Sequence, residues 1–324
     1  MTTPKPELTR AGTVALVGRT NVGKSTLLNA ALELPLGIVS PKPQTTRDQL
    51  LGVVRHAGAE IGLLDTPGLH HARTRLGQTM NASARDAVRS ADVVVLVTAL
   101  PPHPGAELRP HPGDLELLDT MPRDRPLVLV INKIDLLRDK RALLPLLAAY
   151  AEARPVAAIV PVSALRADGI ERVLDEVARL LPEGSPRHAA DALTDRPLRY
   201  FAAEYVREPI LAATVEEVPH AVAVVIDRFV EPPDGGTLHI AATIHVERLG
   251  QKKILVGRGG GLLKRIGTQA RQRIEALTGR KVMLELWVRV SENWRERPGM
   301  LAELGYDLTA PARSDDPGEP KAGS

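Results

Sequence analysis

Residues 18–25, Gly-Arg-Thr-Asn-Val-Gly-Lys-Ser, have the spacing of a phosphate-binding loop. The glycines let the backbone wrap around phosphates, and the amides that open the following helix attract anions. In such a loop the lysine, Lys24, reaches the β- and γ-phosphates, and the hydroxyl of Ser25 ligates Mg²⁺. The residues of this loop that we expect to contact a nucleotide are Gly18, Asn21, Val22, Gly23, Lys24, Ser25 and Thr26.

Three later stretches follow predicted strands in the order that one shared site requires. Residues 65–68, Asp-Thr-Pro-Gly, offer the carboxylate of Asp65 to Mg²⁺ through water and the amide of Gly68 to the γ-phosphate. Residues 132–135 and 163–165 follow two further apolar runs. Because doubly wound sheets bind ligands at the carboxyl ends of their strands, we expect all three stretches to converge on the phosphate loop.

The stretch Asn-Lys-Ile-Asp at residues 132–135 predicts which base is bound. The carboxylate of Asp135 can accept two hydrogen bonds from guanine N1–H and N2–H₂, whereas adenine offers no such pair of donors. The sequence therefore predicts GTP and GDP as ligands, with the backbone amides of Ser163 and Ala164 donating to guanine O6. The remaining residues expected around the nucleotide are Asn132, Lys133 and Leu165.

A polar loop at residues 40–48, Ser-Pro-Lys-Pro-Gln-Thr-Thr-Arg-Asp, has the composition of a switch. Either Thr45 or Thr46 could complete the coordination of Mg²⁺ once a γ-phosphate is present, and we favour Thr46. The expected metal ligands are thus Ser25, Thr46 and Asp65, and the expected catalytic residues are Lys24, Thr46, Asp65 and Gly68.

Leucine follows Gly68 where a glutamine could orient the attacking water. With Leu69 there, either another group positions the water or intrinsic turnover is slow. His70 and His71 are close enough in sequence to be considered as a general base, but histidines of flexible loops are more often solvated, which is what we expect here.

The apolar pattern predicts an α/β doubly wound domain over residues 11–182. Near-continuous apolar runs at 13–18, 61–65, 92–97, 127–132 and 157–162 are typical of parallel strands buried on both faces. Amphipathic segments between the runs predict helices on both sides of the sheet. Residues 183–197 are rich in proline, glycine and charge, and are predicted to be a linker.

The second domain, predicted at 198–310, has a different pattern. A helix over 198–213 precedes strands at 221–230 and 237–248, a strand-like run, a glycine loop, a basic helix over 262–277 and a strand at 282–290. This α-β-β-α-β order resembles the α+β fold of KH-type RNA-binding domains, in which such a loop clamps the backbone of single-stranded nucleotides. The expected RNA contacts are Gly257, Arg258, Gly259, Gly260, Lys264 and Arg265. Residues 311–324 have the composition of a flexible tail.

Charge supports a polyanionic partner for the second domain. The chain carries a net charge of +3, but residues 248–289 contain eleven lysines and arginines against two glutamates, so this segment carries +9 and the rest −6. A solvated basic helix face is the alternative explanation. The chain has no cysteine, and no apolar run approaches the length that spans a bilayer, so we expect a cytoplasmic protein.

Taken together, these motifs resemble those of the Era family of bacterial GTPases. The resemblance is carried by residues 18–25, 43–47 (PQTTR), 65–68, 132–135 and 163–165, and more specifically by 216–224 (EEVPHAVAV), 279–290 (GRKVMLELWVRV) and 294–306 (WRERPGMLAELGY). It implies GTP hydrolysis coupled to binding the 3′ end of small-subunit ribosomal RNA, as a switch in the assembly of the small ribosomal subunit. Leu69 matches a GTPase class with an apolar residue in place of the glutamine. Asn21 resembles an asparagine that binds an activating K⁺ in related enzymes.

Two alternatives remain beside this interpretation. A ribosome-assembly GTPase of the Der kind would need a second phosphate loop, and residues 257–267 contain glycines but no Gly-Lys-Ser/Thr. An RNA-binding scaffold with a vestigial nucleotide site is opposed by the intact Lys24, Ser25, Asp65 and Asp135. The sequence leaves open a peripheral contact with the inner face of the cell membrane.

Overall fold

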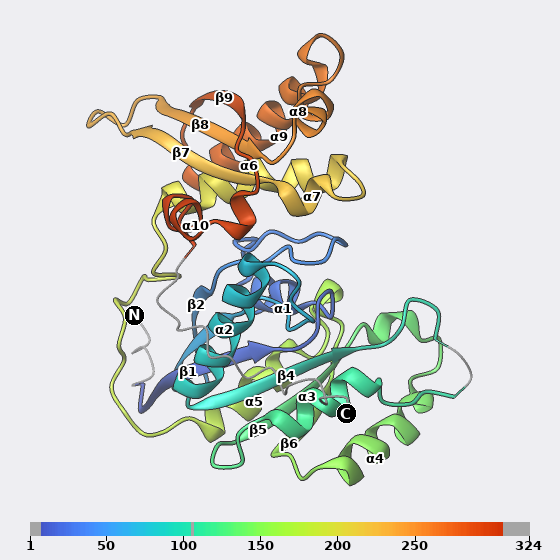
Figure 1. The fold of residues 1–324 in the computed structure, drawn as a ribbon. Helices are drawn as coiled ribbons and strands as arrows, with labels where there is room; N and C mark the ends of the chain where they lie inside the picture. The colour runs from blue at the N-terminus through green and yellow to red at the C-terminus, as the bar shows by residue number, and fades with distance from the viewer. Residues whose placement is uncertain (1–7, 105–106, 307–324) are drawn as a thin grey trace, which may run out of the picture.

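A six-stranded sheet forms the body of the first domain in the computed structural model, which describes residues 8–104 and 107–306 (Figure 1). Its strand order is β2-β3-β1-β4-β5-β6, and every neighbouring pair is parallel except β2 and β3. The strands are β1 (Arg10–Val17), β2 (Leu50–His56), β3 (Ala59–Asp65), β4 (Val93–Ala99), β5 (Leu127–Asn132) and β6 (Ala158–Pro161). The predicted doubly wound domain is confirmed, with an antiparallel strand at one edge.

Helices cover both faces of this sheet because its strands are apolar on both sides. In β1, Val14 and Leu16 belong to one core cluster, and Ala15 and Val17 belong to a second cluster. The helices are α1 (Lys24–Leu32), α2 (Arg75–Ser90), α3 (Pro112–Thr120), α4 (Leu143–Ala153) and α5 (Ile170–Leu180), with single 3-10 turns at Ile134–Leu136, Lys140–Ala142 and Ala164–Arg166. The sequence pattern does not mark α3, which buries only Asp114 and Leu118.

The second domain is built on a three-stranded sheet of order β7-β8-β9. β7 (Ala223–Val230) and β8 (Leu238–Val246) are antiparallel, and β9 (Val282–Val290) runs parallel to β8. The helices are α6 (Leu198–Ala213), α7 (Val218–Ala221), α8 (Leu249–Val256), α9 (Gly261–Thr278) and α10 (Pro298–Glu303), with 3-10 turns at Arg258–Gly260 and Trp294–Glu296. The predicted tail, 311–324, lies outside the described residues.

The run before the second glycine loop is a helix, so the prediction of a strand there is wrong. The side-chain oxygen of Gln251 accepts hydrogen bonds from the amides of Glu247 (2.9 Å) and Arg248 (3.0 Å), which caps α8 at its start. Gln251 and Leu255, four residues apart, form the buried side of the helix. The apolar residues 254–256 are too few to show that helical period on their own.

The segment between the domains follows the antiparallel edge of the large sheet. Leu193 O accepts a hydrogen bond from the amide of Val53 in β2 (2.9 Å), and Arg55 donates to the carbonyls of Ala189 and Ala190. Arg196 then donates to the carboxylate of Asp48 (2.7 Å) and to Gln49 O (2.6 Å). This segment is therefore attached to the first domain almost to the start of α6.

None of the helices in the described ranges is long and apolar enough to cross a membrane.

Candidate functional site

The first glycine loop joins β1 to α1 and passes close to neighbouring backbone. Gly23 has φ 100°, in the left-handed region, and a Cβ at this position would lie 2.3 Å from Nδ2 of Asn132. At Gly18 a Cβ would lie 2.2 Å from Val97 O. The loop therefore needs glycine at both positions, and its conformation brings the backbone amides to the N-terminus of α1.

Lys24 is buried beneath this loop. Its ammonium donates to Gly18 O (3.1 Å) and Arg19 O (3.0 Å), and the residue is 6 % exposed. Burial lowers the pKa of Lys24 to about 8, and the nearby carboxylate of Asp65 opposes this shift. The ammonium is thus held at the loop by neutral carbonyls, which a bound phosphate can replace with a charged partner.

The three predicted metal ligands lie together. Ser25 Oγ is 2.6 Å from Asp65 Oδ2 and 2.8 Å from Thr46 Oγ1, and Thr46 Oγ1 is 3.3 Å from the same carboxylate oxygen. The hydroxyl of Thr45 instead donates to Lys42 O (2.7 Å), so of the two threonines only Thr46 joins this cluster.

Asp65 supplies the charge of that cluster. It is 1 % exposed, and burial raises its pKa while Lys24 and the two hydroxyls oppose the shift. Its buried Oδ1 has no hydrogen-bond partner in the described part of the chain. Mg²⁺ prefers a few oxygen ligands from protein and takes the rest from water and phosphates, so these oxygens fit a Mg²⁺ site.

A cavity of about 400 Å³ joins these groups to the switch loop. Its walls come from the first glycine loop and α1, from residues 38–41 and 44–46, and from Gly68 and Lys133. Gly68 lies against Thr20, since a Cβ on Gly68 would approach Thr20 Cα to 2.8 Å. Lys24, Ser25, Thr46 and Gly68 therefore line one space, and Asp65 adjoins it through its contact with Ser25.

Asn132 links the two predicted base-binding loops to the first glycine loop. Its Nδ2 donates to Val22 O (2.8 Å), and its Oδ1 accepts from the amides of Lys133 (2.7 Å) and Ala164 (3.0 Å). The carboxylate of Asp135 accepts a hydrogen bond from Ser163 Oγ at 2.6 Å. Three loops distant in sequence thus meet where the sequence places a guanine.

The predicted contact of guanine O6 with backbone amides differs in detail from the structure. The Ser163 amide donates to Asp168 O (2.9 Å), and the Ala164 amide donates to Asn132. An O6 contact therefore requires one of these amides to share or exchange its acceptor. Leu165, also predicted in this site, is 79 % exposed at its edge.

The histidines after Gly68 are not alike. His71 is exposed as expected, but His70 is half-buried, and the expectation that it is solvated is wrong. Its Nδ1 lies 2.9 Å from Gly68 O, and its Nε2 lies 2.8 Å from Nε2 of Gln44 in the switch loop. Leu69 donates its amide to Gly18 O (3.2 Å), which fixes this loop to the first glycine loop.

The second glycine loop is exposed, in contrast to the first. Gly257, Gly259 and Gly260 have φ of 72°, 56° and 77°, and a Cβ on Gly259 or Gly260 would meet no heavy atom within 4 Å. Arg258, just after the first of these glycines, is exposed. The conformation requires glycine, while the open space leaves the backbone free to meet a large ligand.

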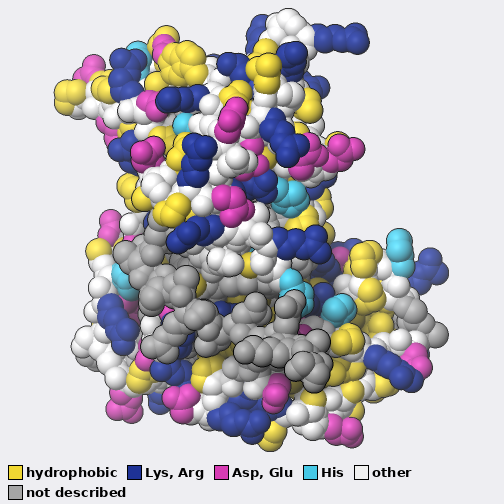
Figure 2. All heavy atoms as spheres, in the orientation of Figure 1, with side chains coloured by type: hydrophobic (Ala, Val, Ile, Leu, Met, Phe, Trp, Pro, Cys, Tyr) yellow, Lys and Arg dark blue, Asp and Glu magenta, His cyan; other side chains and the backbone are white. Residues whose placement is uncertain are grey.

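A second cavity, of about 420 Å³, lies beside this loop on α9 and β9. Its apolar walls include Leu263, Leu284 and Leu286, and Lys264 stands at its edge. Lys264 and Arg265 are exposed. Figure 2 shows lysine and arginine side chains, dark blue, gathered over α8 and α9 of the upper domain. A cationic loop next to an apolar groove suits a ligand with a charged backbone and flat bases.

The site has further neighbours, from distant parts of the chain, that no motif predicts. Arg19 of the first glycine loop makes a two-point ion pair with the fully buried Asp114 of α3 (2.6 and 3.0 Å). Arg47, next to Thr46, reaches the carbonyls of Pro219 and Val222 in the second domain. No local pattern marks such pairs; the only signal is that each arginine adjoins a recognised motif.

Comparison with known proteins agrees with this geometry. Residues 13–133 match the family described as 50S ribosome-binding GTPase, and residues 217–295 match the KH domain family. The chain is 45 % identical over 298 residues to GTPase Era of Geobacter metallireducens, covering 92 % of this chain and 98 % of that protein. It is 44 % identical over 305 residues to GTPase Era of Xanthomonas campestris pv. campestris, covering 92 % and 98 %.

A solved structure supports the same assignment over both domains. The crystal structure of Era in complex with MgGDPNP and nucleotides 1506–1542 of 16S ribosomal RNA is 39 % identical, with a TM-score of 0.86, and covers 93 % of this chain and 100 % of that one. These observations agree: the relatives match over 92 % of the chain, two domain families match, and the cluster around Lys24 and Asp65 fits a GTPase. The chain belongs to the Era family of GTPases.

Proposed function

We propose that this GTPase binds the 3′ end of small-subunit ribosomal RNA and acts as a GTP-dependent switch in the assembly of the small ribosomal subunit. The observation that carries the proposal is the presence of both required surfaces in one chain: the buried cluster around Lys24 and the exposed cationic glycine loop at 257–260. The related Era structure with MgGDPNP and a 16S ribosomal RNA fragment supports it.

In this proposal the nucleotide residues act by position and charge. Lys24 neutralises charge along the β/γ bridge, Asp135 selects guanine, and Gly68 offers its amide to the γ-phosphate. Ser25, Thr46 and Asp65 would hold Mg²⁺, which when bound would neutralise developing phosphate charge. Thr46 already lies beside Ser25 in the structure, and a bound γ-phosphate would complete the site around it.

We also propose that K⁺ activates hydrolysis through Asn21. The residue has φ 62°, and its Nδ2 donates to Pro41 O of the switch loop at 2.7 Å, so Oδ1 is the atom it can offer to a cation. A cation there would lie beside both the first glycine loop and the switch loop. Equal hydrolysis rates in KCl and NaCl at matched ionic strength would reject this role.

The proposed domain boundaries are 11–182 for the GTP-binding domain and 198–310 for the RNA-binding domain, joined by 183–197. The two separate sheets and the path of the joining segment support them. The scaffold alternative predicts no hydrolysis of GTP. The direct test is to measure hydrolysis by the purified chain and its loss in Lys24→Ala. Turnover retained in Lys24→Ala would move the site elsewhere.

RNA binding is tested by filter binding of the full chain to single-stranded RNA ending in the 3′ sequence of small-subunit ribosomal RNA. Affinity should fall steeply with salt, because the basic loop and helix displace counterions from the RNA backbone. A scrambled RNA is the sequence control. Vesicles containing an anionic lipid test the peripheral membrane contact, and vesicle binding that RNA does not displace would support that contact.

A further inference from the structure

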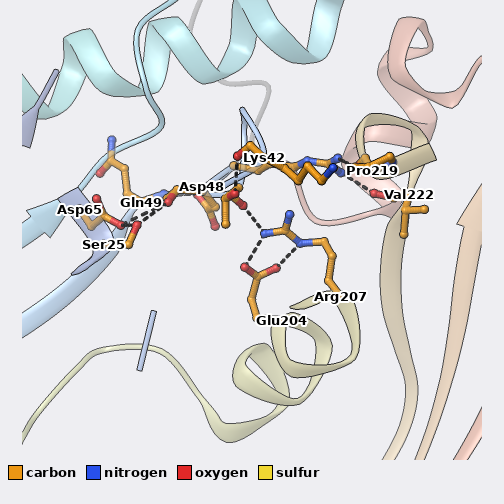
Figure 3. Close-up of polar contacts among 12 residues, drawn as sticks. Ser25, Lys42, Asp48, Gln49, Asp65, Glu204, Arg207, Pro219 and Val222 are labelled. Carbon is orange, nitrogen blue, oxygen red and sulfur yellow. Dashed lines mark hydrogen bonds and ion pairs between the residues drawn. The ribbon is translucent and has the colours of Figure 1, made fainter. Parts of the chain in front are cut away.

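The second domain holds the chain on both sides of Thr46. Arg207 of α6 donates from Nη2 to Thr45 O at 2.5 Å. Arg47, on the other side, enters the second domain, and its Nη1 donates to Val222 O at 2.5 Å. Figure 3 shows these contacts running from Ser25 and Asp65 to Glu204, Arg207, Pro219 and Val222. Thr46, which lies at the proposed Mg²⁺ site, is therefore flanked by two contacts between the domains.

The guanidinium of Arg47 is almost enclosed by the second domain. Besides Val222 O, it donates to Pro219 O (3.0 Å), His220 O (3.1 Å) and the hydroxyl of Tyr306 (3.2 Å), and the residue is 5 % exposed. Consecutive Cα atoms are about 3.8 Å apart, so while the guanidinium of Arg47 stays docked, the backbone of Arg47 restrains the position of Thr46.

The partners of Arg47 are neutral, which makes this contact easy to reverse. Among the described residues, no carboxylate lies within ion-pair distance of Arg47, whereas Arg207 pairs with Glu204 of its own helix at 2.6 Å. Burying a charge against neutral acceptors leaves much of its desolvation uncompensated. Separation of the domains would return Arg47 to water and leave the Arg207–Glu204 pair intact.

The C-terminal segment of the second domain also touches α2, which follows the Asp-Thr-Pro-Gly loop. Leu76 and Met80 of α2 share a buried cluster with Trp294 and Leu301. The Trp294 side chain is fully buried, and the guanidinium of Arg47 lies 5.8 Å from its ring. Trp294 therefore lies where the switch loop, through Arg47, and α2 both meet the second domain.

We propose that Arg47 is a positioning residue for GTP hydrolysis: its docking in the second domain holds Thr46 beside Ser25 and Asp65, and release of that domain releases Thr46. The inference rests on the proposed role of Thr46 and deepens it. The hydrolysis rate then depends on whether the second domain is docked on the first, and no additional group has to enter the nucleotide site.

The first test compares Arg47→Gln with Arg273→Gln in the full chain. Arg273 also joins the domains through a neutral carbonyl, Pro35 O at 3.0 Å, but it contacts neither flank of Thr46. We expect Arg47→Gln to lower kcat about tenfold, equivalent to about 1.4 kcal/mol in the barrier. GDP affinity should stay within about twofold, because the proposed role of Thr46 is in a site completed by the γ-phosphate, which GDP lacks. Arg273→Gln should stay near wild type, and Arg47→Lys, which keeps the charge, should recover part of the loss.

A second readout needs neither metal nor nucleotide. The chain has two tryptophans, and Trp287 is 51 % exposed, so Trp287→Phe leaves the buried Trp294 as the only tryptophan. In that background, acrylamide quenching of Trp294 should rise about twofold with Arg47→Gln and little with Arg273→Gln. Should Arg47→Gln fail to fold, Tyr306→Phe removes a single acceptor of Arg47 and should lower kcat about twofold.

The outcomes separate the inference from the proposed function. Suppose that Thr46→Ala hydrolyses little GTP while Arg47→Gln or Tyr306→Phe keeps wild-type kcat and quenching. That result overturns the inference and leaves the proposed function intact. Equal losses in Arg47→Gln and Arg273→Gln also overturn it, because docking as a whole would then set the rate. Wild-type hydrolysis by Thr46→Ala removes the proposed role of Thr46 and this inference with it.

Discussion

The lowered pKa of Lys24 predicts that the protein takes up a proton when it binds nucleotide near pH 8. In the free site burial lowers the pKa of this ammonium to about 8. Phosphates next to Lys24 favour its charged form, so its pKa in the complex is higher than in the free protein. Between the two values the complex holds more protons than the separate partners, so binding takes up a proton and affinity falls as pH rises.

The magnitude follows from the free pKa. With a value of about 8, roughly a tenth of the free molecules have neutral Lys24 at pH 7 and about three quarters at pH 8.5. GTP binding should therefore take up about 0.1 proton at pH 7 and about 0.8 at pH 8.5. The apparent Kd should rise about fourfold, which is under 1 kcal/mol.

Isothermal titration calorimetry measures this uptake as the difference in heat between two buffers with different ionisation enthalpies. The range from pH 7 to 8.5 lies between the last ionisation of the phosphates and that of guanine N1–H, and both contribute equally to the control. Lys24→Arg is the matched control, because a guanidinium stays protonated over this range. Uptake that stays near zero at pH 8.5, or that persists in Lys24→Arg, would show that Lys24 does not carry the proton.

Other changes test the base, the second glycine loop and the core of the first domain. Asp135→Asn should weaken GTP and favour xanthosine triphosphate, whose carbonyl at position 2 accepts where guanine donates; unchanged preference in competition assays would reject the assignment. Gly259→Asp adds a charge and strain at φ 56° without a clash, so filter binding should show RNA affinity lost and GTP affinity retained; the reverse result would exchange the roles of the two loops. Asp114→Asn should lower the free energy of unfolding by about 2 kcal/mol in urea, because it leaves Arg19 without its buried carboxylate. Asp86→Asn, in an exposed ion pair, is the control and should change it by under about 0.5 kcal/mol; equal effects would refute the argument from burial.

Local signals account for what could be predicted from the sequence. The strands of the large sheet are buried on both faces, so continuous apolar runs marked them, and the phosphate loop is a contiguous motif. The sequence does not decide between Thr45 and Thr46, because the directions of two adjacent side chains depend on the backbone conformation of the loop. The structure brings Thr46 to Ser25 while Thr45 turns back to Lys42.

Contacts between distant segments could not be predicted in the same way. Arg47 meets Val222 across 175 residues, and its partners are mostly backbone carbonyls, which every sequence has. The sequence of α8 predicts a strand because its apolar run is short and its cap is a glutamine side chain. The contacts of Arg47 and the cap of α8 are both hydrogen bonds to main-chain groups. Every residue has such groups, so the residue types do not reveal these bonds.

The attachment of residues 189–196 beside β2 sets the length of the tether between the domains. Arg196 is still bound to the first domain, and α6 starts at Leu198, so the free tether is little longer than Pro197, whose φ is −70°. A short tether turns docking into an intramolecular event with an effective concentration in the millimolar range or higher. The neutral contacts of Arg47 therefore need only about millimolar intrinsic affinity to keep the domains docked, and a ligand that favours separation by about 1–3 kcal/mol can reverse their populations.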